Sequence, residues 1–137
     1  MIRHATTDDL PQLVHLANNF WELSGVPGDF ESDRVATMGQ GLIDMAHGLL
    51  LRGGDSMLGA VIMQPMHTAN WDIAVELFWY SQDNTGARLY KEFEQWAEDM
   101  EADEIRLSSI TSLGDSVARF ASKREYVPWE VSYSLLL

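Results

Sequence analysis

One stretch constrains the fold of this chain more than any other, a strand-like run followed at once by a turn and a helix. Residues 71–81 are apolar or aromatic apart from a few positions that include Asp72 and Glu76, which is typical of a buried strand. A polar turn over residues 82–86 breaks the run, and apolar residues then recur every three or four positions up to Met100, as on one face of a helix. The N–H groups of such a helix's first turn lack helical partners and can bind a phosphate.

The remaining pattern predicts one α/β domain over residues 1–137, because no linker, repeat or low-complexity tract interrupts it. The other predicted strands cover residues 1–5, 48–52, 57–64, 104–110 and 129–137. The other predicted helices run from residues 6–9 to 19–23, from 32–34 to 47, and onward from 112–115. A strand, helix and parallel strand unit places its ligand loops at the carboxyl ends of the strands. We expect the final strand to be buried in the sheet.

Composition excludes several classes of function. The net charge of −12, from 21 acidic and nine basic residues, opposes binding to nucleic acid. The chain has no apolar run near the roughly 18 residues that a membrane span needs, and Asp8 and Asp9 stand where a signal peptide would be apolar, so we expect a cytoplasmic protein without a membrane partner.

Metal and thiol chemistry are not expected either. The sequence has no cysteine, which excludes disulfides, a thiolate nucleophile and cysteine-ligated metals. The four histidines are scattered without ligand spacing and predict no metal site. They are His4, His15, His47 and His67.

The central stretch and its surroundings resemble a known family. ELFWY before the turn and LYKEFEQWAEDMEADEIRLSS after it look like the acyl-CoA-binding core of the GNAT superfamily of N-acyltransferases. IRHATTDDLPQLVHLANNF is similar to the family's first strand and helix, SMLGAVIM to its third strand, and SVARFASKREYVPWEVSYSL to its last helix and strand. The resemblance implies an α/β (α+β) mixed sheet of six or seven strands flanked by about four helices, in a small single-domain bacterial or phage-type member.

The resemblance implies that acetyl-CoA binds as co-substrate over the turn. The family's loop pattern is Arg or Gln, two residues, Gly, one residue, then Gly or Ala; Ser81 and Asn84 depart from it and Gly86 matches. The loop is therefore degenerate, although Gln82 lies one residue from the first position. The implied CoA-binding residues are Phe78, Trp79, Tyr80, Gln82, Asn84, Thr85, Gly86, Ala87 and Arg88.

Two side chains are candidates for catalysis under the same resemblance. Glu76 lies on the central strand, where family members often carry a base, and burial would raise its pKa toward neutrality. The family's tyrosine acid would fall at Ala121, so Tyr126 is the candidate acid and Tyr80 another. Glu125 replaces a glycine at the end of the last helix, where a left-handed conformation is expected.

Two functions remain open. The first is an N-acetyltransferase that moves an acetyl group from acetyl-CoA to an amine of a small molecule or a protein by direct attack. The second is a catalytically inactive GNAT-fold binding or structural protein, with or without CoA binding, which the departures at Ser81, Asn84 and Ala121 favour. Sheet edges and many aromatic residues also suggest a homodimer.

Overall fold

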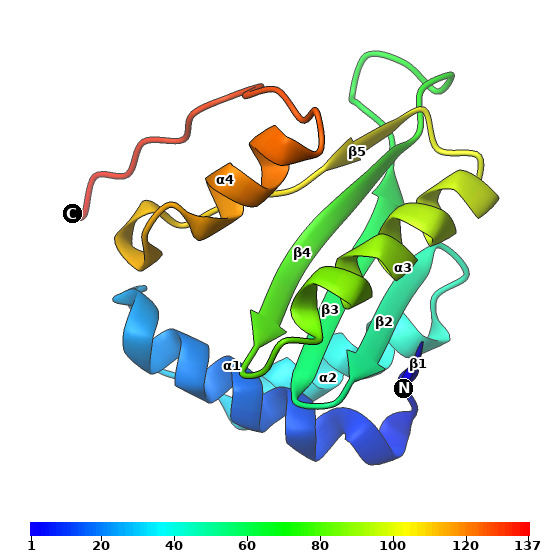
Figure 1. Ribbon diagram of the computed structural model, residues 1–137. Helices are drawn as coiled ribbons and strands as arrows, with labels where there is room; N and C mark the ends of the chain where they lie inside the picture. The colour runs from blue at the N-terminus through cyan, green and yellow to red at the C-terminus, as the bar shows by residue number, and fades with distance from the viewer.

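A five-stranded mixed sheet forms the centre of the protein (Figure 1). The computed structural model describes residues 1–137, except for the side chain of residue 111. The strands are β1 (Ile2–His4), β2 (Gly48–Gly53), β3 (Ser56–Met63), β4 (Ile73–Ser81) and β5 (Glu104–Arg106). They lie in chain order across the sheet, and neighbours are antiparallel except β4 and β5, which are parallel.

Four α-helices cover the sheet. They are α1 (Leu10–Ser24), α2 (Ser32–Asp44), α3 (Gly86–Asp99) and α4 (Ser116–Lys123), with short 3-10 turns at Thr7–Asp9 and Thr111–Leu113. In Figure 1, α3 crosses one face of the sheet while α1 and α2 lie behind the other. The crossover through α3 joins the parallel pair β4 and β5, as the sequence pattern predicts.

The core has two layers because both faces of the sheet are buried. In β2 the alternation is direct: Leu49 and Leu51 pack in the cluster with α3, whereas Leu50 packs in the cluster with α1 and α2. A strand buried on both faces reads as a continuous apolar run, which is why residues 48–52 predict a strand without alternating polarity.

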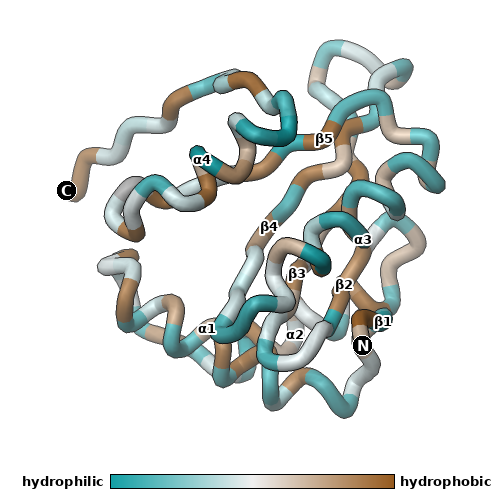
Figure 2. Tube along the Cα trace, in the orientation of Figure 1, coloured by the Kyte–Doolittle hydropathy of each residue, from teal (hydrophilic) through white to brown (hydrophobic). Residues whose placement is uncertain are grey.

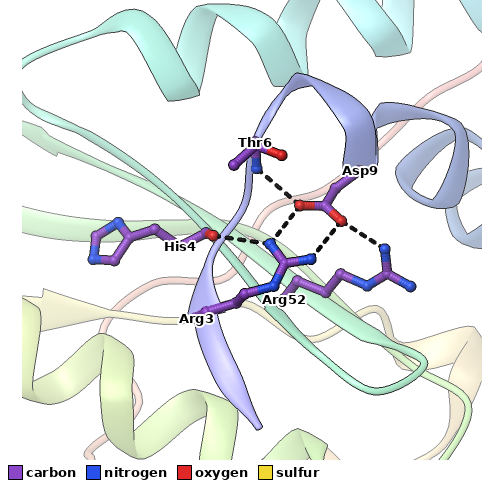
Figure 3. A network of polar contacts seen from close by, with 5 residues as sticks. All are labelled: Arg3, His4, Thr6, Asp9 and Arg52. Atoms are coloured by element: carbon purple, nitrogen blue, oxygen red, sulfur yellow. Dashed lines mark hydrogen bonds and ion pairs between the residues drawn. The ribbon is translucent and has the colours of Figure 1, made fainter.

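A carboxylate fixes the chain where β1 enters the first helix (Figure 3). Asp9 accepts hydrogen bonds from Arg3 at 2.7 and 2.8 Å, from Arg52 at 2.6 Å and from the Thr6 N–H at 2.8 Å. The side chain of Asp9 is buried, and these partners, Arg3 first, hold the pKa of its carboxyl well below the usual range. The network ties β1, β2 and the start of α1 together.

The structure confirms the predicted fold class and corrects its strand number. The sheet has five strands, not six or seven. The predicted strand over residues 129–137 is wrong, because these residues adopt no strand and lie exposed. The predicted strand over residues 104–110 pairs only from 104 to 106. A two-residue alternation indicates that a segment can form a strand, but it does not say which edge will pair with it.

Candidate active site

β4 and β5, the last two strands of the sheet, separate part-way along β4. Their pairing ends at Val75 and Arg106. Just beyond this point β4 carries a bulge against β3: Gly59 lies opposite Phe78 and Ala60 opposite Glu76, so that one extra residue stands between them. A bulge bends its strand and re-aims its side chains. The outcome is that β4 turns away from β5 immediately after Glu76.

Glu76 lies where the two strands part. Its carboxylate accepts a hydrogen bond from the Ser108 N–H at 3.1 Å, in the segment that follows β5. The residue is 7% exposed, and this burial raises the pKa of its carboxyl to about 7, with the Ser108 N–H acting in the opposite direction. A carboxylate in this range can accept a proton at neutral pH and release it again.

The loop between β4 and α3 is organised by a carboxylate that the sequence pattern did not indicate. Asp83 Oδ1 accepts hydrogen bonds from the Thr85 N–H at 2.9 Å, from Thr85 Oγ1 at 2.5 Å and from Ser56 Oγ at 2.9 Å. Asp83 Oδ2 accepts one from the Asp55 N–H at 2.9 Å. These bonds hold the loop against the β2–β3 turn, and the Thr85 hydroxyl and backbone donors keep the pKa of Asp83 well below its usual range.

The start of α3 still presents free amides beside this carboxylate. The helical ladder begins with the Leu89 N–H, which donates to the Thr85 carbonyl at 3.0 Å. The amides of Gly86, Ala87 and Arg88 precede it and therefore have no acceptor within the helix. They can bind an anion, but the fixed negative charge of Asp83 at the same loop opposes a phosphate.

Gly86 is required by a close approach of β4 to α3. A Cβ at this position would lie 2.8 Å from Ser81 Oγ and 3.3 Å from Trp79 Nε1. The Trp79 indole N–H is buried and has no hydrogen-bond partner among the described residues. Since an unpaired buried donor costs free energy, the strand before the loop carries a donor that a ligand could satisfy.

Aromatic side chains fill the space between β4, α3 and α4. The ring centroids of Trp79 and Tyr90 lie 4.9 Å apart, and Phe120 lies 5.2 Å from each. The three rings join the end of β4 to both helices, which fixes Trp79 on the α3 face of the sheet. On the opposite face, Phe78 stacks on Tyr80 at 4.9 Å and packs in the cluster with α1 and α2.

Tyr126 is held by polar contacts between α3 and the end of α4. Its hydroxyl donates to Glu94 at 2.9 Å and accepts from the Tyr90 hydroxyl at 3.2 Å. Arg124 also pairs with Glu94. Burial raises the pKa of Tyr126 to about 12. As a proton donor, Tyr126 would have to exchange its bond to Glu94 for one to the leaving group.

The end of α4 keeps the geometry expected of glycine although a glutamate stands there. Glu125 has φ 67°, and the following Tyr126 N–H donates to the Ala121 carbonyl at 3.0 Å. This is the bond that closes a helix through a left-handed residue. The backbone therefore adopts the left-handed helix end that usually carries glycine, and Glu125 is strained as a result.

Tyr80 lies within the electrostatic influence of Glu76. Burial, and then the charge of Glu76, raise the pKa of Tyr80 to about 12. Its ring also lies 5.0 Å from that of Phe20 on α1.

The remaining predicted CoA contacts lie at the surface of the loop and at the start of α3. Gln82, Asn84, Ala87 and Arg88 are exposed around the loop. Asp83 and Ser108 were missed because their roles depend on bonds to Asp55, Ser56 and Glu76, which are distant in sequence. The spacing from Asp83 to Thr85, typical of a side chain that caps its own turn, was the one available signal.

No family model matches the chain, and no curated protein matches it. Solved structures do. The aminoglycoside N-acetyltransferase AAC(6')-Iy in complex with CoA superposes with a TM-score of 0.72 at 9% identity, covering 100% of this chain and 93% of that one. The aminoglycoside 6'-N-acetyltransferase AAC(6')-IG from Acinetobacter haemolyticus gives 0.64 at 19%, covering 100% and 96%. A transcriptional regulator from Bacillus halodurans C-125 gives 0.75 at 15%, covering 100% and 99%.

The chain therefore has the fold of the GNAT acetyltransferases, as its sequence pattern predicts. In these structures the likeness extends over nearly the full length of both chains. Among the described residues, no helix is long and apolar enough to cross a membrane. Within the same part of the chain, no three acidic, histidine or cysteine side chains gather in a way that could hold a metal ion.

Proposed function

We propose that this GNAT-fold chain transfers an acetyl group from acetyl-CoA to an amine. The observation that carries the proposal is the position of Glu76, a buried carboxyl with a pKa near 7 at the point where β4 and β5 part. A structural carboxylate at such a place would usually be neutralised by a cation, but the contact of Glu76 is a single backbone N–H from Ser108. This environment suits proton transfer.

In the proposed reaction Glu76 accepts a proton from the acceptor's ammonium group, directly or through a water molecule. Acetyl-CoA supplies the acyl group as a thioester: the amine nitrogen bonds to the carbonyl carbon, and the bond to sulfur breaks. Backbone N–H groups of β4 between Phe78 and Tyr80 would stabilise the charge that develops on the carbonyl oxygen. The departing thiolate takes a proton from Tyr80 or Tyr126.

The loop residues would hold the CoA end of the co-substrate. The amides of Gly86, Ala87 and Arg88 and the side chain of Arg88 offer positive partners for a diphosphate. The buried indole N–H of Trp79 offers a further donor beside them.

A second candidate function is a binding protein without turnover. The specific observation in its favour is Asp83, whose charge lies at the loop where a diphosphate would bind. In this case acetyl-CoA would bind weakly or not at all, and Glu76 would play no part in a reaction.

A thermal-shift titration with acetyl-CoA separates the two functions. At a ligand concentration of 100 Kd, binding should stabilise the fold by about 2.7 kcal/mol. Arg88→Glu should weaken the shift because it places a negative charge at the first turn of α3. Lys91→Glu makes the same charge change at another exposed position on α3 and serves as the control. Equal shifts in both variants would contradict the loop assignment.

Turnover is then measured by release of free CoA thiol with a panel of amines. The chain contributes no background to a thiol reagent, because it has no cysteine. Glu76→Gln should slow turnover by about 10²-fold or more if Glu76 is the base, while leaving the acetyl-CoA shift in place. A shift without thiol release from any amine would favour the binding function.

A further inference from the structure

Exposed apolar side chains stand beside Glu76. Leu77 follows it on β4 and is 49% exposed at the bulge. Ile110 and Leu113 lie in the segment that continues from Ser108, the residue whose N–H donates to Glu76, and both are exposed. The Leu113 N–H donates to the Ile110 carbonyl at 3.0 Å, which holds these two residues in one short turn. Both segments that part at Glu76 therefore present apolar surface next to it.

The end of α1 adds a third side to this surface. The Ser112 hydroxyl donates to the Ser24 carbonyl at 2.8 Å, so the segment after β5 meets the last turn of α1, as Figure 1 shows. Leu23 and Val26 lie on either side of Ser24 in the chain and are exposed. Figure 2 shows hydrophobic stretches at this end of α1 and along β4. We call the five exposed side chains the apolar rim: Leu23, Val26, Leu77, Ile110 and Leu113.

Two aromatic rings extend the apolar surface toward the proposed base. The ring centroids of Phe20 on α1 and Tyr80 on β4 lie 5.0 Å apart, and both residues are only partly buried. Burial, and then the charge of Glu76, raise the pKa of Tyr80 to about 12, so this pair of rings lies within the field of the carboxylate. The surface nearest Glu76 is thus both apolar and aromatic.

The charge around the apolar rim is negative. The connection from α1 to α2 is held in place by Trp21, whose indole N–H donates to the Gly28 carbonyl at 3.1 Å and whose ring lies 6.0 Å from that of Phe30. Between residues 20 and 33 there is no basic side chain, and the four acidic ones are exposed: Glu22, Asp29, Glu31 and Asp33. A surrounding of this sign favours a cationic ligand over an anionic one.

We propose that the acceptor is a small primary amine with an aromatic body, an arylalkylamine rather than a polar polyamine such as an aminoglycoside. The inference rests on the proposed function, because the acceptor nitrogen must come within reach of Glu76 to give up its proton. With the ammonium group at Glu76, the body of the acceptor lies against the side chains around it, which are the apolar rim and the pair of Phe20 and Tyr80. The transfer is the one described above: the nitrogen bonds to the acetyl carbon, and the bond to sulfur breaks.

The chemistry of this surface discriminates between the two kinds of amine. An acceptor rich in hydroxyl groups would lose water from its polar groups against leucine, isoleucine and phenylalanine side chains that offer no hydrogen bond in return. An aromatic body instead removes apolar surface from water on both partners. Its ring can also pack edge to face against Phe20 or Tyr80.

A calorimetric titration of the full chain tests the preference without requiring turnover. The probes are 2-phenylethylamine and 2-(2-aminoethoxy)ethanol, two primary amines of which only the first has an aromatic body. With CoA present, 2-phenylethylamine should bind at least about 10-fold more tightly.

Variants of the apolar rim should remove this preference. Leu77→Ser changes the rim on β4, and Ile110→Ser with Leu113→Ser changes it on the segment after β5; all three side chains are exposed, so unchanged far-ultraviolet circular dichroism is expected. The control is Met63→Ser, because Met63 is also 49% exposed but lies opposite Ile73, at the other end of β4. This control should keep the preference of the wild type.

Release of CoA thiol then separates this inference from the proposed function. kcat/KM for 2-phenylethylamine should exceed that for 2-(2-aminoethoxy)ethanol, and that for kanamycin, by about 10-fold or more. If 2-phenylethylamine binds with the expected preference but no amine releases thiol, the proposed function fails while the amine-binding surface stands. Equal binding of the first two amines, or a preference that the rim variants on both elements retain, would overturn the inference, as would faster turnover of kanamycin.

Discussion

Replacing Glu76 with Gln should make the protein more stable while removing its proposed base. Burial raises the pKa of Glu76 to about 7 from an ordinary 4.5. The unfolded chain therefore ionises this group more readily than the folded chain, and raising the pH between these values favours unfolding. The difference corresponds to about 3 kcal/mol at 1.36 kcal/mol for each pKa unit.

Because the pKa of Glu76 is raised in the folded state, the effect of Glu76→Gln on stability should depend on pH. Below about pH 4.5 the carboxyl is neutral in both states, so the wild type and Glu76→Gln should have similar free energies of unfolding. Above pH 7 the wild type bears the full penalty of a buried charge, and Glu76→Gln should be more stable by up to about 3 kcal/mol. The amide oxygen of Gln can still accept from the Ser108 N–H.

Urea unfolding followed by tryptophan fluorescence at pH 5 and pH 8 measures this difference. The control is Glu98→Gln, which neutralises an exposed glutamate on α3 and should show little change between the two pH values. Equal midpoints for wild type and Glu76→Gln at pH 8 would refute a buried, high-pKa carboxyl at this site. In the enzyme, kcat/KM should rise with pH and level off above about pH 7, because the base must be ionised.

Three further outcomes are expected. Asp9→Asn should destabilise the fold by about 2 kcal/mol in urea unfolding, because charge-assisted bonds to Arg3 and Arg52 are lost. Since the pKa of Asp9 is depressed in the folded state, this difference should persist above about pH 4 and shrink as the pH falls. A difference that stays constant down to about pH 2 would contradict this account. Glu125→Gly should raise the free energy of unfolding by about 0.5–1 kcal/mol by relieving a left-handed residue, with Glu125→Ala giving no gain as the comparison. Tyr126→Phe should lower the free energy of unfolding by about 1 kcal/mol, because the hydrogen bond to Glu94 is lost. If turnover also slows by about 10²-fold or more, Tyr126 is the acid. Unchanged turnover would leave that role to another group.

The order of elements and the class of fold follow from local patterns in the sequence. The run of residues 71–100 predicts a strand, a turn and a helix because apolar periodicity depends on local geometry, and the structure has β4 and α3 at these places. Glu76 could also be selected from the sequence as a buried carboxyl, because it interrupts an otherwise apolar strand.

The construction of the site and the course of the C-terminal segment depend instead on tertiary contacts. Three features of the site join residues that are distant in sequence and meet through sheet pairing. They are the bulge before Phe78, the contact of Ser108 with Glu76, and the hydrogen bonds of Asp83 in the loop. The same reason explains the segment over residues 129–137. The alternation of this segment indicates that it can form a strand. The hydrogen bonds of a strand need a second strand beside it, and the pattern of one segment does not specify which strand that is.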